Sequence, residues 1–306
     1  MHKAGNKLSD RPHIPWALAV LLAAGACGTP NPAVDDTPTS GSVLMIADAD
    51  CRTAIDKELM VFGAFYPKAR IRMRYMDEGA LLQAMLNDSV RCVVTTTVPT
   101  GAQQAFYQKR NITTPVVPVY KSGVAVVVNK ESPLQHLDLQ GLARLLGKGM
   151  AAGTDTLQAL FVGQGSGIAR LLKDTLHLHT LRAQAVQDVD DLVAQVARST
   201  RSVGFLPFEA LSDQDDPQVQ ALRSQVRLLP IARTATDPPA AISQSTLADG
   251  SYPLPRTVNI LLTEGKSGLG TGFVSFVANH KGQRIILKLG LVPIKIPERN
   301  VEIVHE

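Results

Sequence analysis

The segment FVGQGSGIARL, residues 161–171, carries residue types that could hold an anion. Gly165, Ser166 and Gly167 follow an apolar run, and a helical pattern begins at Ile168. Glycines let a ligand approach the backbone, and the N–H groups at a helix N-terminus point towards negative charge. The spacing fits neither the dinucleotide fingerprint G-x-G-x-x-G nor a P-loop ending in Gly-Lys-Ser/Thr. The pattern therefore predicts either an anion site, with Ser166 as a hydroxyl donor, or a plain glycine turn that enters a helix.

Two further groups of candidate ligand-binding residues follow predicted strands. Thr95, Thr96 and Thr97 end the third strand, and Asp50 and Cys51 follow the first. Side chains at the carboxyl ends of parallel strands line the cleft of an α/β fold. For the threonines, β-propensity is an equal explanation. For Cys51 a packed thiol is favoured over a nucleophile, because no His is near it in the sequence.

The sequence does not indicate an enzyme or a metal centre. His177 and His179 lie two residues apart in a predicted helix, so they face different sides, and no carboxylate cluster accompanies them. No G-x-S-x-G nucleophile elbow occurs. We predict no catalytic residue, no metal site and no cofactor.

The elements that must position these candidates alternate between strand and helix. Because parallel strands need helical crossovers, this order predicts a parallel sheet covered on both faces. Cys51 and Cys92 would then lie at opposite ends of neighbouring strands, about 15 Å apart, so we expect two free, buried thiols. The predicted strands are 42–47, 70–75 and 91–96, and the helices cover 55–65, 81–86 and 102–110.

The second half of the chain predicts another domain of the same class. Residues 114–130 form two extended runs joined at 121–123, and the second run carries the chain out of the first domain. Strand and helix then alternate, segment 234–256 is turn-rich and loop-like, and strand 257–263 returns. Two α/β domains joined by two extended crossings form a hinge with a cleft. We predict domain I over 42–125 and 257–306, and domain II over 126–256.

The N-terminal residues have the features of an export signal. Basic residues precede an apolar run, 14–26, which is too short to span a membrane. The run ends in Ala-Gly-Ala before Cys27, which resembles a bacterial lipobox; an ordinary signal peptide is the alternative. We predict a signal peptide over 1–26, a lipid anchor on Cys27, and a flexible tether over 27–41 that is rich in Pro, Thr and Gly.

The composition argues against nucleic acid as a partner. The 306 residues carry a formal net charge of +4, and 5% of them are aromatic. Without residues 1–26 the chain has 28 basic and 26 acidic residues, so it lacks the charge and the stacking surface of a nucleic-acid binder. With 45% hydrophobic residues it can bury a core, and its length suggests about two domains.

The C-terminal segment GLGTGFVSFVANHKGQRIILKLGLVP, residues 268–293, resembles the end of the phosphate-binding proteins of ABC importers, the PstS-like family. Residues 126–129 resemble that family's crossing strand, 165–167 its phosphate turn and 203–205 its Gly-aromatic strand. The resemblance spans about residues 42–304. It implies an α/β type II periplasmic-binding-protein fold, a monomeric two-domain clamp that closes on an oxyanion and delivers it to a transporter permease. It also implies a place on the periplasmic side of a bacterial envelope.

The chain departs from that family in its phosphate turn. Val162, Gln164 and Ile168 stand where the family has Arg, Asp and Thr. Asp50 stands where it has a small hydroxyl residue, and Glu78 lies in a segment that replaces a Ser-rich turn. Added acids and a lost arginine weaken the binding of a dianion.

Three interpretations of these departures remain open. Arg52 or a lysine such as Lys121 supplies the missing charge, or the ligand is another small polar molecule with a positive group for Asp50 or Glu78. Alternatively, ligand binding is degenerate. We predict capture of phosphate or a similar oxyanion for an ABC importer, with a non-transport binding or scaffold lipoprotein as the alternative.

Overall fold

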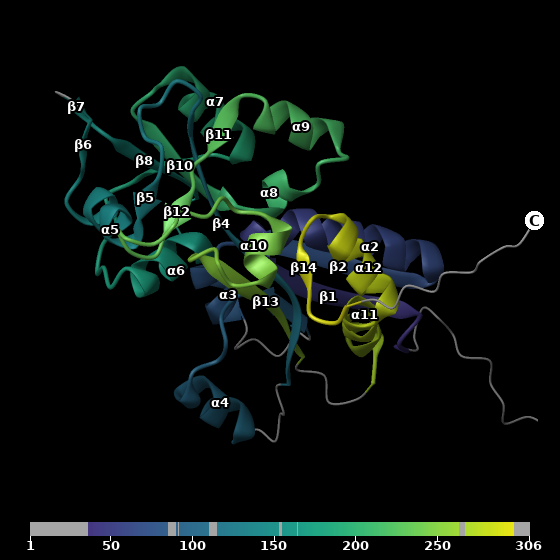
Figure 1. The fold of residues 1–306 in the computed structure, drawn as a ribbon. Coiled ribbons are helices and arrows are strands. Elements are labelled where there is room, and N and C mark those ends of the chain that lie inside the picture. The colour runs from purple at the N-terminus through teal and green to yellow at the C-terminus, as the bar shows by residue number, and fades with distance from the viewer. Residues whose placement is uncertain are drawn as a thin grey trace, which may run out of the picture.

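A computed structural model describes residues 36–84, 90, 92–109, 115–152, 155–163, 165–262 and 267–296. Within these residues, strands and helices alternate and build two α/β domains around one curved sheet (Figure 1). The elements of the first part are β1 (Gly41–Asp48), the 3-10 turn η1 (Ala49–Cys51), α2 (Arg52–Phe65), β2 (Ala69–Met76), α3 (Glu78–Ala84), β3 (Cys92–Thr95), α4 (Gly101–Gln108) and β4 (Val116–Asn129).

The chain then enters the second domain and returns from it to the first. The elements that follow β4 are β5 (Leu137–Asp138), α5 (Leu139–Gly147), β6 (Ala151–Ala152), β7 (Asp155–Thr156), β8 (Gln158–Val162), α6 (Gly167–Thr175), β9 (Gln184–Val186), α7 (Val189–Arg198) and β10 (Ser202–Pro207). The remaining elements are α8 (Glu209–Ser212), α9 (Pro217–Arg223), β11 (Val226–Leu228), β12 (Ile231–Ala232), α10 (Gln244–Ala248), β13 (Pro255–Leu262), α11 (Leu269–Ala278), α12 (His280–Lys288) and β14 (Val292–Pro293).

The main sheet has the strand order β2-β1-β3-β13-β4-β10-β8-β9, and β11 and β14 also pair with β4. β1 lies parallel to β2 and β3, as the alternation of strand and helix predicts. The side chains of β1 alternate between two cores, because successive side chains of a strand point to opposite faces. Met45 packs in the large core with α2 and α11, whereas Ile46 packs with Leu81 of α3 and Tyr107 of α4. Both faces of the first domain's sheet are therefore covered.

β4 connects the two domains. Residues 116–123 of this strand pair with β13, and residues 124–128 pair with β10 of the second domain. The prediction of two runs joined at 121–123 is wrong, because these residues stay in the ladder with β13 and β4 continues for 14 residues. β13 is the return crossing and begins opposite Gly123. The place where β4 changes its partner from β13 to β10 lies beside the predicted domain limit at 125/126. The domain limits themselves stay a prediction.

The turn-rich segment 234–256 is not all loop, which corrects the sequence-based expectation. It contains α10, which begins with a capping box made by Ser243 and Thr246. The Gln244 side-chain amide then donates to the backbone carbonyls of Leu287 and Leu291, so tertiary contacts hold this short helix. β13 also begins inside the segment, at Pro255.

The two ends of the described chain meet in the first domain. α11 and α12 pack beside α2, with yellow and purple ribbons adjacent in Figure 1. Phe62 of α2 contacts Phe273 and Phe276 edge-on, with ring centroids 5.5 and 5.3 Å apart. Asp36 accepts the Leu269 N–H at 2.7 Å, so the end of the predicted tether contacts the start of α11.

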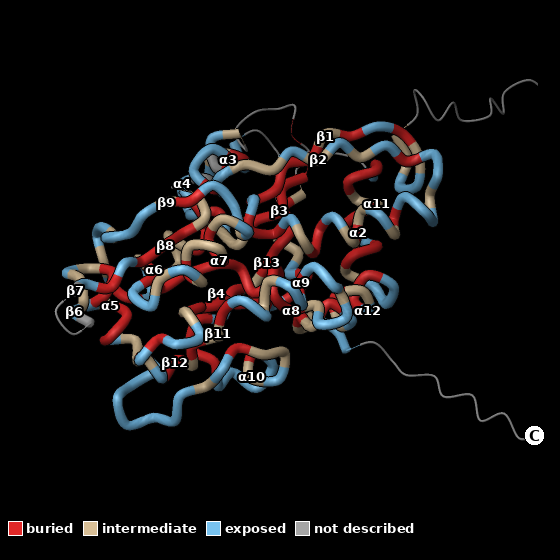
Figure 2. Tube along the Cα trace, turned by 90° about the horizontal axis from the view of Figure 1, so that it is seen from above, coloured by how far each residue is buried: buried red, intermediate tan, exposed pale blue. Residues whose placement is uncertain are grey.

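Buried residues are concentrated on the crossing strands, β4 and β13, and on the strands next to them, at the centre of Figure 2. Cys51 and Cys92 are buried thiols that form no disulfide with each other, as predicted. None of the described helices is long and apolar enough to cross a membrane. Residues 1–35, with the predicted signal peptide and Cys27, lie outside the described residues.

One acid lies unpaired in the core of the first domain. Glu58 of α2 is fully buried, and neither carboxyl oxygen has a hydrogen-bond partner among the described residues. Burial raises the pKa of Glu58 from 4.5 to about 9. The folded chain therefore keeps a proton that the unfolded chain releases above pH 4.5, so this group lowers the free energy of unfolding as the pH rises towards 9.

Glu58→Gln is expected to be more stable than the wild type in alkaline solution and similar to it near pH 4. The difference should grow by about 1.4 kcal/mol for each pH unit over the range in which only the unfolded glutamate ionises. Urea unfolding at several pH values measures it. Glu131→Gln, at an exposed position, is the matched control and should follow the wild type. Parallel curves for Glu58→Gln and the wild type would contradict a neutral buried Glu58.

Candidate ligand site

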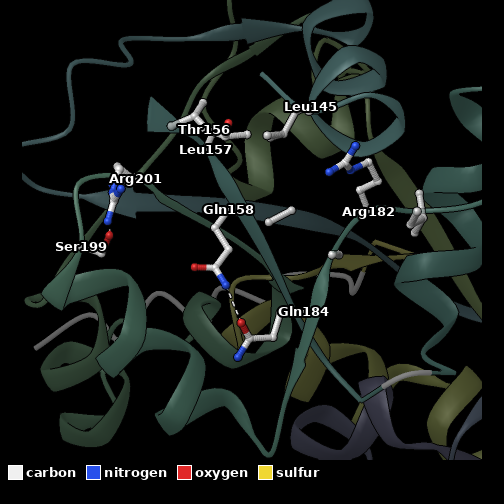
Figure 3. Close-up of a pocket in the computed structure, with 12 residues that line it drawn as sticks. Leu145, Thr156, Leu157, Gln158, Arg182, Gln184, Ser199 and Arg201 are labelled. Carbon is white, nitrogen blue, oxygen red and sulfur yellow. Dashed lines mark hydrogen bonds between the residues drawn. The ribbon is translucent and has the colours of Figure 1, made fainter. Parts of the chain in front are cut away.

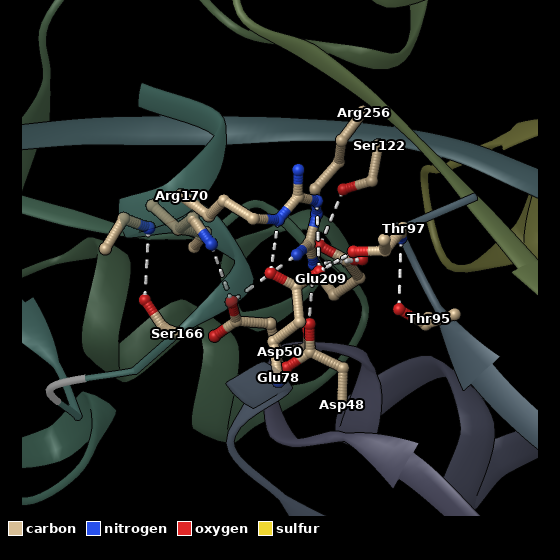
Figure 4. A network of polar contacts seen from close by, with 12 residues as sticks. Asp48, Asp50, Glu78, Thr95, Thr97, Ser122, Ser166, Arg170, Glu209 and Arg256 are labelled. Atoms are coloured by element: carbon tan, nitrogen blue, oxygen red, sulfur yellow. Dashed lines mark hydrogen bonds and ion pairs between the residues drawn. The ribbon is translucent and has the colours of Figure 1, made fainter. Parts of the chain in front are cut away.

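Polar residues from both domains converge where the first-domain strands end and α6 begins (Figure 4). Asp48 ends β1, Asp50 lies in η1, and Glu78 begins α3. Ser166 is the N-cap of α6 in the second domain, and its Oγ accepts the Ala169 N–H at 3.2 Å. The predicted glycine turn therefore does enter a helix, and that helix points at acids of the other domain.

The N-terminus of α6 holds a carboxylate from the chain itself. The Ile168 N–H donates to Asp50 Oδ2 at 3.1 Å, and the bond is buried. Unpaired N–H groups and the helix dipole make such a terminus a place for negative charge. The Asp50 carboxylate thus occupies the anion position of α6, and it comes from the opposite domain.

Gly167 lies against two polar side chains of the first domain. A Cβ atom on Gly167 would be 2.5 Å from Asp48 Oδ2 and 3.3 Å from Thr96 Oγ1, so only glycine fits this approach. Asp48 is 0% exposed. Asp48 Oδ2 and Thr96 Oγ1 are both buried with no hydrogen-bond partner among the described residues. Two polar atoms beside the start of α6 are therefore left unsatisfied.

The two neighbouring aspartates favour the protonated form more than usual. Burial and, to a smaller extent, the Asp50 charge together raise the pKa of Asp48 to about 7, against the opposing effect of Arg256. Burial also raises the pKa of Asp50 to about 6, opposed by Arg256 and by the Ile168 N–H. The site can therefore carry a proton between the two carboxyl groups near neutral pH.

An ion pair joins the domains beside these aspartates. Arg170 of α6 makes a two-pronged contact with Glu78: Nε donates to Oε2, and Nη2 donates to Oε1 at 3.0 Å. Glu78 is 2% exposed and also accepts the Thr97 hydroxyl. Since a paired guanidinium and carboxylate offset each other's charge, Arg170 is not a free cation for a ligand.

A second arginine lies deeper, at the joint between the domains. Arg256 of β13 donates through Nη2 to the Asp50 carbonyl at 2.8 Å and to Glu209 Oε1 at 2.6 Å. Its Nη1 is 3.7 Å from Asp50 Oδ2. Glu209 also accepts the Ser122 hydroxyl at 2.6 Å and the Tyr120 hydroxyl at 3.2 Å, so both crossing strands enter this network.

The other predicted site residues differ in what they contact. Thr95 is buried, and its Oγ1 accepts the Thr97 N–H at 3.0 Å within the turn after β3. Cys51 is 0% exposed, and burial raises the pKa of its thiol. Gly165 is exposed, and a Cβ there would contact the Asp77 side chain at 3.3 Å. The structure thus brings Ile168, Gly167 and Asp50 together, whereas Cys51 faces the core; their roles as ligand-binding residues stay a prediction.

Neither proposed replacement for the missing arginine lies in this network. The Arg52 guanidinium is 4.1 Å from the centroid of the Tyr75 ring, and Lys121 is exposed on β4. The cations of the site are Arg256 and Arg170, which the sequence reasoning missed together with Glu209. Arg256 had a signal, because it is the single charge in the strand PRTVNILL.

Of four cavities among the described residues, the largest lies away from this network. A space of about 570 Å³ lies at the edge of the second domain, lined by residues that include Gln158, Arg182 and Gln184 (Figure 3). None of the four cavities found among the described residues is lined by Asp48, Asp50 or Ser166. The described residues also contain no group of three or more His, Cys, Asp or Glu placed to hold a metal ion.

A family model described as a PBP superfamily domain matches residues 33–281. The chain belongs to the periplasmic-binding-protein (PBP) superfamily. No match to this sequence is found among curated proteins. Solved PBP-fold structures resemble it closely in shape but little in sequence, so they establish the fold and not the ligand.

Three solved structures illustrate the range of this PBP fold. A protein from Clostridium perfringens with bound phosphate has a TM-score of 0.68 at 14% identity, covering 83% of this chain and 100% of that chain. An ABC-type phosphate transport receptor from Vibrio cholerae has a TM-score of 0.65 at 13% identity, covering 82% and 99%. The CcmR regulatory domain from Synechocystis, in complex with 2-PG, has a TM-score of 0.53 at 13% identity, covering 78% and 96%. The two-domain α/β PBP fold predicted from the C-terminal motif is confirmed.

Arg256→Met is expected to lower the free energy of unfolding by about 3–5 kcal/mol, because it leaves Glu209 buried without its cation. The Glu209 side chain is 0% exposed. Urea unfolding measures the loss, and the double variant Arg256→Met/Glu209→Gln should recover part of it.

Lys57→Met is the matched control, because it breaks the more exposed Lys57–Asp216 pair, whose nitrogen and oxygen are 3.5 Å apart. That loss should be at most about 1 kcal/mol. Equal losses in the two single variants would contradict a central role for Arg256.

Proposed function

We propose that this PBP-superfamily protein is a lipid-anchored extracytoplasmic binding protein that captures phosphate or a similar small oxyanion for an ABC importer. One observation carries the proposal: the Ile168 N–H at the start of α6 already binds an oxyanion, the Asp50 carboxylate, between the two domains. A helix N-terminus that faces a strand-end cleft is suited to an anion. The role is binding and delivery rather than catalysis.

The acids of the site favour an oxyanion that carries a proton. Asp48 Oδ2 is buried and has no donor among the described residues. A protonated phosphate oxygen can donate to such a carboxylate, whereas sulfate has no proton to donate and would be repelled. Phosphate is therefore the first ligand to test.

Titration calorimetry of the chain from Gly28 onward, which keeps every described residue, tests the ligand. Phosphate, molybdate and sulfate are each titrated. We expect phosphate to bind with a dissociation constant in the micromolar range or below, and more tightly than sulfate. Failure of all three at millimolar concentration would remove the oxyanion function.

Gly167→Ala should weaken that binding at least tenfold, because the added Cβ would meet Asp48 Oδ2 and hinder closure. Gly79→Ala is the matched control: this glycine also lies in the first turn of a helix, and its added Cβ meets nothing within 4 Å. Equal affinities in the two variants would remove the α6 turn from the site.

A second candidate function follows from the charges around the site. Asp48, Asp50 and Glu78 are buried there, and both arginines of the site are paired with carboxylates. This arrangement favours a ligand that carries a positive group. In this second candidate function the protein is a binding lipoprotein that does not serve transport. Putrescine in the same calorimetric series discriminates the two, since only the second candidate function expects it to bind.

The lipid anchor is a further part of the proposal, and it rests on the sequence before Cys27. Labelled palmitate should be incorporated into the full chain expressed in a bacterium and should be lost in Cys27→Ala. Cys51→Ala is the matched control and should keep the label, because this thiol is buried in the folded domain. Label that persists in Cys27→Ala would refute the anchor.

A further inference from the structure

The closed contact between the domains is made by the chain's own groups at the place where the proposed ligand would bind. Asp50 reaches from η1 to the Ile168 N–H of α6, with an oxygen to nitrogen distance of 3.1 Å. The same carboxyl oxygen lies 3.7 Å from Arg256 Nη1. A helix N-terminus and a guanidinium are the two groups that an external anion would use, and Asp50 uses both.

The space beside this carboxylate is also taken. Asp48 Oδ2 lies so close to Gly167 that a Cβ there would be 2.5 Å away. Both carboxyl groups therefore lie directly against the start of α6, at the place where an external anion would bind.

The buried polar atoms around Asp50 point to an occupant other than a side chain. Asp48 is 0% exposed, and its Oδ2 has no partner among the described residues. Thr96 Oγ1, on the same side of Gly167, is unsatisfied as well. Asp50 fills the anion position without satisfying these two atoms, whereas a ligand with both donors and acceptors would satisfy them.

We propose that Asp50 is an internal ligand: its carboxylate holds the anion position of α6 and keeps the two domains together, so that an external ligand binds only by displacing it. This inference rests on the proposed function for the identity of the displacing ligand but not for the contact itself. Asp50 then determines affinity and specificity. An external ligand can bind only those molecules in which Asp50 has left the anion position of α6, so the observed affinity is the intrinsic affinity multiplied by that fraction.

Removal of the carboxylate should convert the position into a site for free carboxylates. In Asp50→Ala, the Ile168 N–H loses its hydrogen-bond acceptor and Arg256 Nη1 loses the negative charge 3.7 Å away. Formate supplies the same carboxylate group from solution. We expect formate to bind Asp50→Ala at least tenfold more tightly than the wild type. Amide exchange at Ile168 should be slow in the wild type, fast in Asp50→Ala, and slow again when formate is added.

Asp190→Ala is the matched control, because it removes one negative charge from an exposed position of α7. It should behave like the wild type in both measurements. Small-angle scattering adds an independent reading: Asp50→Ala should be more open than Asp190→Ala and should close with formate. If Asp50→Ala does not fold, Asp50→Ser, which keeps a small polar group, serves the same test.

The outcomes separate this inference from the proposed function. Slow exchange at Ile168 in Asp50→Ala, with a formate affinity equal to that of Asp190→Ala, would overturn the internal ligand even if the wild type binds phosphate. Fast exchange that formate reverses would establish the internal ligand even if no tested oxyanion binds the wild type.

Discussion

The buried guanidinium of Arg256 is the interaction on which the joint between the two domains depends. It donates to the Asp50 carbonyl of the first domain and to Glu209, next to the second domain's β10. Glu209 in turn accepts the hydroxyls of Ser122 and Tyr120, which lie on the other crossing strand. Only Nη2 of Arg256 is hydrogen-bonded, because Nε and Nη1 have no hydrogen-bond partner among the described residues. Removing one partner of a buried ion pair leaves the other charge uncompensated, so the network depends on Arg256 and Glu209 together. It fixes where η1, and with it Asp50, stands relative to α6.

The site combines two tendencies that oppose each other. The N-terminus of α6 attracts negative charge, and three buried acids of the first domain lie around it. Burial raises the pKa of Asp48 and of Asp50, neighbouring acids raise both further, and Arg256 opposes both shifts. Negative charge gathered in this way repels a further anion. A protonated oxyanion or a cationic group can donate a hydrogen bond to a buried carboxylate, whereas an anion without a proton is repelled by it.

Membership of the PBP superfamily establishes the fold but not the ligand, which depends on the residues of the binding site. The same fold is found in a phosphate transport receptor and in a regulatory domain in complex with 2-PG. In this chain the first domain has three parallel strands, β2, β1 and β3, and the returning β13 lies antiparallel to both β3 and the long crossing strand β4. Asp50 and Glu78 lie in the turns at the carboxyl ends of β1 and β2, the edge of the sheet where side chains of an α/β fold line the cleft.

The sequence by itself predicted many of the strands and helices and the glycine turn before α6, because periodicity and turn chemistry act between residues close together in the chain. The PBP fold was predicted from the resemblance of the C-terminal segment to a known family. The sequence also singled out Asp50, which stands where the PstS-like family has a small hydroxyl residue. The structure decided what Asp50 contacts: Ile168 is 118 residues away and Arg256 is 206 residues away. A charged residue shows no local pattern that names its partner, and only the packing of the two domains brings these groups within bonding distance. The continuous course of β4 and the pairing of both site arginines depend on the same long-range packing.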